Sequence, residues 1–262
     1  MKYLLPLLLC LPAPSWGQRF QLAAPRIIAD SVFFRQKAQL SLEFDLEGAK
    51  INYTTTGGLP SDSTPVYEKP FVMTASGAVR ARAAHPDFIP SRMEELELVQ
   101  VLHSPDSLSL RTAPDTLYAG KKGGATLFDL QKAGRDLKDG RWLGFRGDTV
   151  VIEVFFKQGV ECKRVIVSHL LDPGAWIFPP KRIEVLGASG AKGWLPMGVW
   201  TARPKTAWEA RQARYDFYQR VVLRPAKAER LQIRIIPFGP LPDGHPGAGK
   251  PAWLFLDEIV FQ

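Results

Sequence analysis

Apolar residues alternate with polar ones in short segments along the whole chain, and this period of two constrains the fold more than any other feature. Successive side chains of a strand point to opposite faces of a sheet, so each segment predicts a half-buried strand. Because no helical segments alternate with these strands, a βα-barrel and a doubly wound nucleotide-binding fold are disfavoured. The clearest segments are residues 40–46, 51–53, 79–83, 95–98, 150–156, 165–167, 183–185 and 231–235.

Residues 1–17 have the pattern of an export signal. Lys2 provides a basic start, residues 4–11 are almost wholly apolar, and small residues lead to Gly17. This apolar run is too short to span a bilayer, so we predict a cleaved signal peptide and a periplasmic or extracellular protein without a membrane span. The alternative is a lipoprotein attached through Cys10, although a leucine precedes it where a small residue is usual.

The chain is long enough for two domains. It has 262 residues, and removal of residues 1–17 leaves Cys162 as its single cysteine, so no intramolecular disulfide can form. The remaining tryptophans all lie beyond residue 140, and a turn-like segment precedes them at residues 103–107. We therefore predict a first domain over residues 18–102 and a second over residues 103–262.

The first half of the chain resembles the small fibronectin-III-like module found near the C-terminus of bacterial chitobiases and beta-hexosaminidases. The resemblance covers residues 25–97 and is carried by residues 51–60, 67–70, 79–84 and 88–91. Two glycines occupy a turn where the family usually has Asp-Gly. The resemblance implies a small sandwich of the immunoglobulin or fibronectin-III type.

Residues 112–262 resemble a discoidin (coagulation factor type C) domain, in the version that ends bacterial exo-acting hexosaminidases. The matching segments are residues 118–124, 126–129, 140–148, 151–154, 176–185 and 242–259. The resemblance implies a jelly-roll β-sandwich, so the whole chain is expected to be all-β. In that family the two modules follow a catalytic barrel, whereas here the signal peptide leads directly into them. The resemblance therefore implies an accessory role and not hydrolysis.

Candidate sugar-binding residues lie in predicted loops of the second half. Sugar recognition combines a flat aromatic face with a few hydrogen-bonding groups in a shallow cleft. Related discoidin-type modules place such a site on loops at one end of the sandwich. The alternative is that the tryptophans fill the core, since tryptophan is highly buried on average. The candidates are Trp142, Trp176, Trp253, Arg146, Asp148 and His245.

Two acidic residues, Asp257 and Glu258, interrupt the last apolar segment. Adjacent strand residues face opposite ways, so one carboxylate is expected among apolar groups, which is costly unless it is paired or binds a cation. The discoidin resemblance implies a structural calcium ion bound by Asp129 and Glu258. Leu130 stands where that family usually has glycine. The alternative is that Asp129 or Glu258 pairs with an arginine such as Arg135.

The sequence predicts a secreted protein that binds carbohydrate, at a glycan terminus, without cleaving it. No carboxylate pair, and no nucleophile with a base, lies in a recognisable catalytic motif, so we predict no enzyme activity. The formal net charge is +8, but the arginines of residues 203–234 lack an interleaved stacking motif, and no nucleic-acid partner is predicted. The alternative function is a structural or docking module that packs against a separate glycosidase or cell-surface assembly and binds no sugar.

Overall fold

The computed structural model describes residues 19–190, 193–202 and 214–262, so the predicted signal peptide lies outside the described residues. Regular structure in this part of the chain is almost entirely strand, with three short 3-10 helices. The prediction of an all-β protein is confirmed. Within the same residues, no helix has the length and apolar character needed to cross a membrane.

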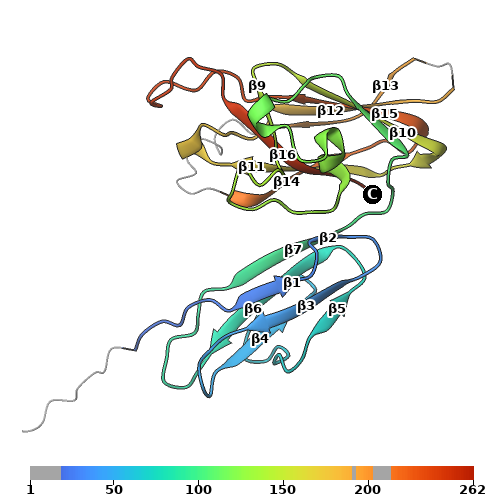
Figure 1. The fold of residues 1–262 in the computed structure, drawn as a ribbon. Coiled ribbons are helices and arrows are strands. Elements are labelled where there is room, and N and C mark those ends of the chain that lie inside the picture. Colours follow the sequence, from blue (N-terminus) through green and yellow to red (C-terminus); the bar gives the residue numbers. More distant parts are fainter. Residues whose placement is uncertain (1–18, 191–192, 203–213) are drawn as a thin grey trace, which may run out of the picture.

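The first seven strands form a two-sheet sandwich, which we call the N-module (Figure 1). One sheet has the order β1-β3-β5 and the other β2-β7-β6-β4. All pairings are antiparallel except that of β2 with β7. The strands are β1 (Arg26–Ala29), β2 (Phe33–Phe34), β3 (Ala38–Glu43), β4 (Lys50–Thr54), β5 (Phe71–Met73), β6 (Gly77–Ala84) and β7 (Glu94–Gln100).

The alternation of strand β6 shows why the N-module folds in this way. Val79 and Ala81 are fully buried between the sheets. The intervening Arg80 points outward and forms an ion pair with Glu95 of β7, with 2.6 Å between Nε and Oε2. The period of two therefore separates a core face from a charged face, as the sequence predicted.

The remaining strands form a larger two-sheet sandwich, which we call the C-module. Its sheets have the orders β13-β12-β15-β10-β8 and β14-β11-β16-β9, and all their pairings are antiparallel. The strands are β8 (Ser107–Leu110), β9 (Leu143–Arg146), β10 (Val150–Glu161), β11 (Arg164–Leu171), β12 (Arg182–Ala188), β13 (Leu195–Thr201), β14 (Arg214–Val222), β15 (Lys227–Ile236) and β16 (Trp253–Phe261). The helices are η1 (Thr116–Tyr118), η2 (Gly123–Phe128) and η3 (Pro173–Ala175).

The core of the C-module lies between its two sheets. Val150, Ile152 and Val154 of β10 point inward and are at most 2% exposed, while the side chain of Glu153 faces solvent. Phe128 of η2 stacks on Phe261 at 5.9 Å between ring centres, so the segment after β8 also covers part of this core. The nine strands found among the described residues form two facing sheets, in agreement with the jelly-roll sandwich that the resemblance implied.

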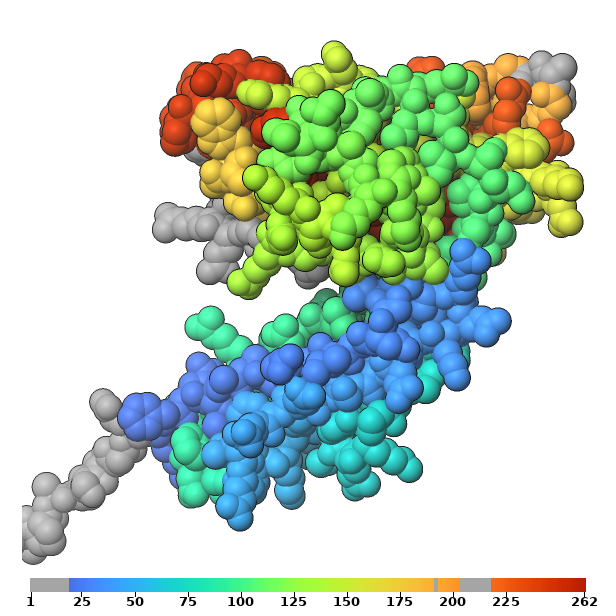
Figure 2. Space-filling model, in the orientation of Figure 1, coloured from blue at the N-terminus to red at the C-terminus, as the bar shows by residue number. Residues whose placement is uncertain are grey.

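An apolar cluster joins the two modules. Phe33, Val99 and Val101 of the N-module pack against Ile166 and Val260 of the C-module, and all five are buried. Figure 2 shows the two modules touching over part of their facing surfaces. Burial of this apolar area favours one fixed arrangement over two independently moving modules.

The segment between the modules is held by backbone hydrogen bonds. The amides of Leu102 and His103 both donate to the carbonyl of Phe261, at 3.1 Å. The side chain of Gln262 donates to the carbonyl of Gln100 at 2.6 Å. The last strand of the C-module therefore fixes the segment that precedes its first strand, and we expect residues 102–106 to resist proteolysis.

Phe33→Ala is expected to open this junction. Truncation of a buried phenylalanine removes about 3–5 kcal/mol of packing free energy, so the modules should loosen and the chain should become sensitive to protease at residues 102–106. Limited proteolysis followed by mass spectrometry measures the effect. Val72→Ala, at a residue that is 50% exposed on β5, serves as the control. Preferential cleavage of the wild-type chain at residues 102–106 would contradict a fixed junction.

Candidate functional site

Several loops of the C-module meet at one end of the sandwich, opposite the end where the inter-module segment bonds to Phe261 (Figure 1). Strand β9 ends at Arg146, β11 ends at Leu171, and β16 begins at Trp253. Because β16 runs antiparallel to both other strands, these three points lie at one end, where Trp253 pairs with Arg146. Loops on a rigid scaffold are common places for binding residues, and all the predicted sugar-binding candidates except Trp142 lie here.

Trp176 occupies an unusual backbone position in this loop group. Its φ of 66° is left-handed, a conformation that a bulky residue rarely adopts. The turn is fixed on both sides: the Trp176 amide donates to the Pro173 carbonyl at 3.0 Å, and the Trp176 carbonyl accepts from the Trp253 amide at 2.9 Å. The indole is half-buried. The surrounding hydrogen bonds thus hold one tryptophan ring partly open to solvent.

The glycine- and proline-rich loop before β16 supports the Trp176 ring. Gly247 lies against the ring edge, since a Cβ on this glycine would stand 3.1 Å from Trp176 Cζ2 and Cη2. The exposed Lys250 places its ammonium 5.3 Å from the ring centre. A cation at this distance is attracted by the ring face. Lys250 was not among the predicted residues, because nothing in its sequence context indicates contact with Trp176.

His245 lies beside Trp176, with 5.9 Å between the ring centres, but it does not offer a free polar group. The ring is 8% exposed. Its Nδ1 accepts from the Gly247 amide at 3.0 Å, so the proton resides on Nε2, which donates to the Pro173 carbonyl at 3.2 Å. We therefore correct its predicted role: His245 fastens the glycine-rich loop to the turn that carries Trp176.

Trp253 forms a second half-buried aromatic surface on the same end of the sandwich. The guanidinium of its cross-strand partner Arg146 lies 5.2 Å from the Trp253 ring centre. Tyr118 packs edge-on against the ring at 5.7 Å. Asp148 is exposed in the turn between β9 and β10. The structure thus brings Trp253, Arg146 and Asp148 to one end of the C-module.

Trp142 does not belong to this surface. It has no exposed area, it packs edge-on against Phe255 at 6.2 Å, and its indole N–H donates to the Gly134 carbonyl at 3.1 Å. The predicted role of Trp142 in sugar binding is therefore wrong, because a ring without an accessible face cannot stack on a sugar. Trp142 instead fills an apolar cluster, which was the alternative expected for the tryptophans.

A β-bulge determines where the acidic pair of the last strand points. Strand β11 pairs Ser168 with Glu258 and the next residue, His169, with Leu256, so Asp257 is the extra residue on β16. Both carboxylates contact the same loop: Glu258 Oε2 accepts from the Leu130 amide, and Asp257 Oδ2 accepts from the Ala133 amide, each at 3.1 Å. The bulge thus turns both side chains toward this loop, and the expectation that they face opposite ways is wrong.

A lysine supplies positive charge to this buried pair. Lys132 Nζ lies 2.7 Å from Asp257 Oδ2 and donates to Ser168 Oγ at 3.0 Å. The same ammonium lies 5.4 Å from the Trp142 ring centre and 5.7 Å from that of Tyr218. Lysine was not among the partners expected for these carboxylates, although its place three residues after Asp129 is visible in the sequence.

The residues implied for calcium do not fit that ion in this arrangement. Calcium sites gather several oxygen ligands, including backbone carbonyls. Here the loop directs amide N–H groups at the carboxylates, and Asp129 accepts from the Gln131 amide while pairing with Lys122 at 3.1 Å. No group of three or more acidic, histidine or cysteine side chains suited to a metal occurs among the described residues. Arg135, the expected alternative partner, forms no ion pair there either.

Burial raises the pKa of Glu258 well above the usual value of a glutamate. Removal from water, together with the neighbouring carboxylates of Asp257 and Asp129, raises the pKa of Glu258 to about 9. One oxygen of Glu258 and one of Asp257 have no hydrogen-bond partner within the described chain. A protonated Glu258 removes one of the two negative charges that would otherwise meet at the bulge.

The comparisons with known proteins add a family match and partial structural similarities. Residues 30–93 match the model of the chitobiase/beta-hexosaminidase C-terminal domain, which bears out the resemblance stated for the N-module. No curated protein matches the chain.

Three solved structures illustrate the structural similarities. The CBM32 of AlyQ in complex with 4,5-unsaturated mannuronic acid is 8% identical, with a TM-score of 0.37 over 61% of this chain and 96% of that chain. The C-terminal domain of a chitobiase from Bacteroides fragilis is 13% identical, with a TM-score of 0.36 over 61% and 95% of the two chains. A SusE-like protein is 12% identical, with a TM-score of 0.39 over 90% and 95%.

The stability of the protein is expected to fall as pH rises from 6.5 to 9. Between pH 4.5 and about 9 the folded chain retains a Glu258 proton that the unfolded chain releases, which lowers stability by up to about 1.4 kcal/mol per pH unit. Burial lowers the pKa of His169 from 6.5 to about 3, so between these values His169 has the opposite effect. The two effects oppose each other from pH 4.5 to 6.5, and above pH 6.5 the effect of Glu258 is no longer opposed by that of His169.

Glu258→Gln should remove the decline above pH 6.5, because glutamine keeps the shape of the neutral acid and does not titrate. Denaturant melts of the variant and the wild type in chelating buffer at pH 6.5, 7.5 and 8.5 measure this difference. Parallel decline of the two proteins over this range would show that Glu258 is ionised in the folded state.

Lys132→Met should destabilise the protein by about 3–5 kcal/mol, because it leaves Asp257 buried without its charge partner. Adding Asp257→Asn should restore part of this loss. Lys138→Met, at an exposed lysine of the same loop, is the control.

The wild-type melting temperature should be the same in chelator and in millimolar calcium. A clear rise in calcium that disappears in Asp129→Ala would instead support the calcium site implied by the sequence.

Proposed function

We propose that this protein is an exported, non-catalytic carbohydrate-binding protein whose binding surface is the loop end of the C-module. The surface consists of Trp176 and Trp253 with Arg146, Asp148 and Lys250. The proposal rests above all on the two half-buried indole rings, which one backbone hydrogen bond links and each of which has a cationic side chain over its face. Aromatic faces beside charged donors and acceptors provide the contacts that a pyranose requires.

The ligand class follows from the shape and charge of this surface. A pyranose stacks its C–H face on an indole, and its hydroxyls accept hydrogen bonds from arginine or lysine and donate to a carboxylate such as Asp148. Arg146 and Lys250 are long exposed side chains, so they can move aside to admit a ring. A shallow surface of this kind buries little area, and we expect dissociation constants on the order of micromolar to millimolar.

The absence of catalysis is part of the proposal. Glycoside hydrolysis requires two carboxyl groups that face a sugar across a cleft. Asp257 and Glu258 have no exposed area and lie beneath the loop that contains Lys132. The match of residues 30–93 is to a C-terminal domain of chitobiases and hexosaminidases, which favours an accessory role beside glycoside hydrolases.

Charge pairing favours a glycan over a nucleic acid as the partner. Two arginines of the C-module are engaged within the protein: Arg220 of β14 pairs with Glu97 of the N-module, and Arg111 pairs with Glu153 at 2.7 Å. Such pairing reduces the continuous positive field that nucleic-acid binding requires. Export by the predicted signal peptide would bring the protein to extracellular or periplasmic glycans.

The alternative docking function has one observation in its favour. Leu195 and Val199 of β13 and Val222 of β14 are 63%, 51% and 68% exposed, and the two strands border each other at one side of the sandwich. Apolar side chains exposed on neighbouring strands suit contact with another protein. A chain that binds no glycan but co-purifies with a glycosidase through these residues would favour this function.

Trp176→Ala should weaken binding of the best ligand from a glycan array by about tenfold or more, equivalent to about 1.4 kcal/mol. Trp194→Ala, at a half-buried tryptophan near the opposite end of the sandwich, should leave the affinity unchanged. Isothermal titration and thermal melts of the same samples separate binding from folding. A folded Trp176→Ala protein with wild-type affinity would reject this surface, and an empty array would reject the function.

A further inference from the structure

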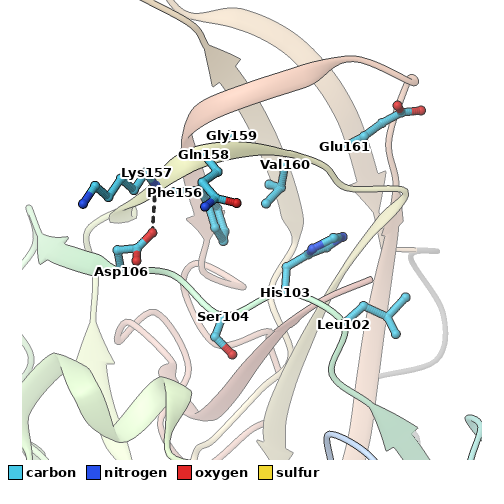
Figure 3. Close-up of a pocket in the computed structure, with 10 residues that line it drawn as sticks. All are labelled: Leu102, His103, Ser104, Asp106, Phe156, Lys157, Gln158, Gly159, Val160 and Glu161. Atoms are coloured by element: carbon cyan, nitrogen blue, oxygen red, sulfur yellow. Dashed lines mark hydrogen bonds between the residues drawn. The ribbon is translucent and has the colours of Figure 1, made fainter.

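A cavity lies at the opposite end of the C-module, beside the segment that joins the two modules, and Figure 3 shows the residues that line it. It has a volume of about 450 Å³ and lies between the inter-module segment and the last half of β10. Ligand sites often lie at such junctions, in clefts of this size. None of the residues proposed above for carbohydrate binding lines this cavity.

Both walls of the cavity are fixed by the backbone. On one side, the amides of Leu102 and His103 bond to Phe261 at the end of β16. On the other side, Asp106 donates its amide to the Phe155 carbonyl at 2.8 Å and accepts from the Lys157 amide at 2.7 Å. The hydrogen bonds that hold the cavity open therefore use main-chain groups and Asp106, and they leave the other side chains available.

A break in the pairing of β10 shapes the second wall. The register of β10 with β15 shifts between Phe155 and Val160, so the residues between them are released from regular pairing. Gly159 has a φ of 63°, and a Cβ there would stand 2.9 Å from Lys227 Cε. Irregularities of this kind redirect side chains and are frequent beside binding sites. Here the irregularity presents Gln158 to the cavity.

Uncommitted polar groups converge on the cavity. In Figure 3, Gln158 on β10 and His103 on the inter-module segment lie on the two sides of the cavity, with the imidazole extending below Val160, whereas the Lys157 and Glu161 side chains extend away. Within the described chain, the side chains of Gln158, His103 and Ser104 have no hydrogen-bond partner, and one oxygen of Asp106 is also unused. Val160 and the buried Phe156 supply apolar surface.

This combination selects a neutral, polyhydroxylated ligand. Amide, hydroxyl and imidazole groups both donate and accept hydrogen bonds, as sugar hydroxyls require. The apolar side chain of Val160 suits the C–H face of a sugar ring. We propose that this cavity is a second saccharide-binding site, in which Gln158, His103 and Asp106 bind the hydroxyls of one sugar unit. The inference takes its ligand class from the proposed function but places the site at the other end of the module.

The test is a residue-resolved titration that observes both sites in one sample. The chain expressed without residues 1–17 and labelled with nitrogen-15 is titrated with N-acetylglucosamine, N,N′-diacetylchitobiose, galactose and glucose, up to about 20 mM because weak sites have millimolar dissociation constants. We expect saturable shifts of the Ser104, Gln158 and Gly159 amides with at least one of these sugars. Gln158→Ala and His103→Ala should each weaken binding at this site by at least tenfold.

Two further variants provide the controls. Lys157→Ala keeps the amide that bonds to Asp106 and removes a side chain that points away from the cavity, so the affinity should stay within twofold of the wild type. Trp176→Ala should leave the shifts of Ser104 and Gln158 unchanged.

The outcomes separate this inference from the proposed function. Shifts confined to Gly247 and the Trp176 indole would overturn the second site and retain the first. Shifts confined to the junction would retain the second site and overturn the loop end. Shifts at neither place with any of the four sugars would overturn both.

Discussion

The ion pair between Lys132 and Asp257 connects parts of the protein that are far apart in sequence. It fastens the long segment between β8 and β9 onto the last strand, at the bulge that directs both carboxylates toward that segment. The loop in turn covers the outer side of the sheet, where Ala133 and Trp142 pack against Leu170 and Phe255. Because this loop covers Trp142, its ring is unavailable to a ligand. Trp253, at the start of β16, remains partly exposed.

Strand β16 links the two proposed binding regions with the junction between the modules. Trp253 at its beginning belongs to the proposed carbohydrate surface, and Val260 near its end belongs to the apolar cluster between the modules. The next residue, Phe261, holds the segment that lines the cavity near the junction between the modules. Both proposed binding surfaces therefore depend on one strand in the middle of a sheet, whose position is fixed by pairing on both sides. Such a scaffold lowers the entropy that binding would otherwise cost.

Sequence patterns predicted the strands with clear alternation, but they did not predict short strands such as β2 and β9 or the arrangement of the site. Alternation predicted the buried faces of β6 and β10, because it depends only on neighbouring residues. The exposure of Trp176 and the burial of Trp142 depend on which loops cover each ring, and no local pattern contains that information. The acidic pair in an apolar strand indicated that a buried carboxylate needs a positively charged partner. The partner itself, Lys132, depends on a bulge whose position is set by the pairing strand β11. The role of His245 likewise depends on contacts with Pro173 and Gly247.

The position of β16 also determines how the protein would carry tension. A glycan held beside Trp253 and a load applied through the N-module would pull on opposite ends of the same strand. Force would then act along β16, at right angles to its hydrogen bonds with β9 and β11. In this shear geometry many hydrogen bonds share the load at once, whereas a strand peeled from one end loses them one at a time. Under the proposed carbohydrate binding, this arrangement would favour a C-module that stays folded while the bound glycan is pulled.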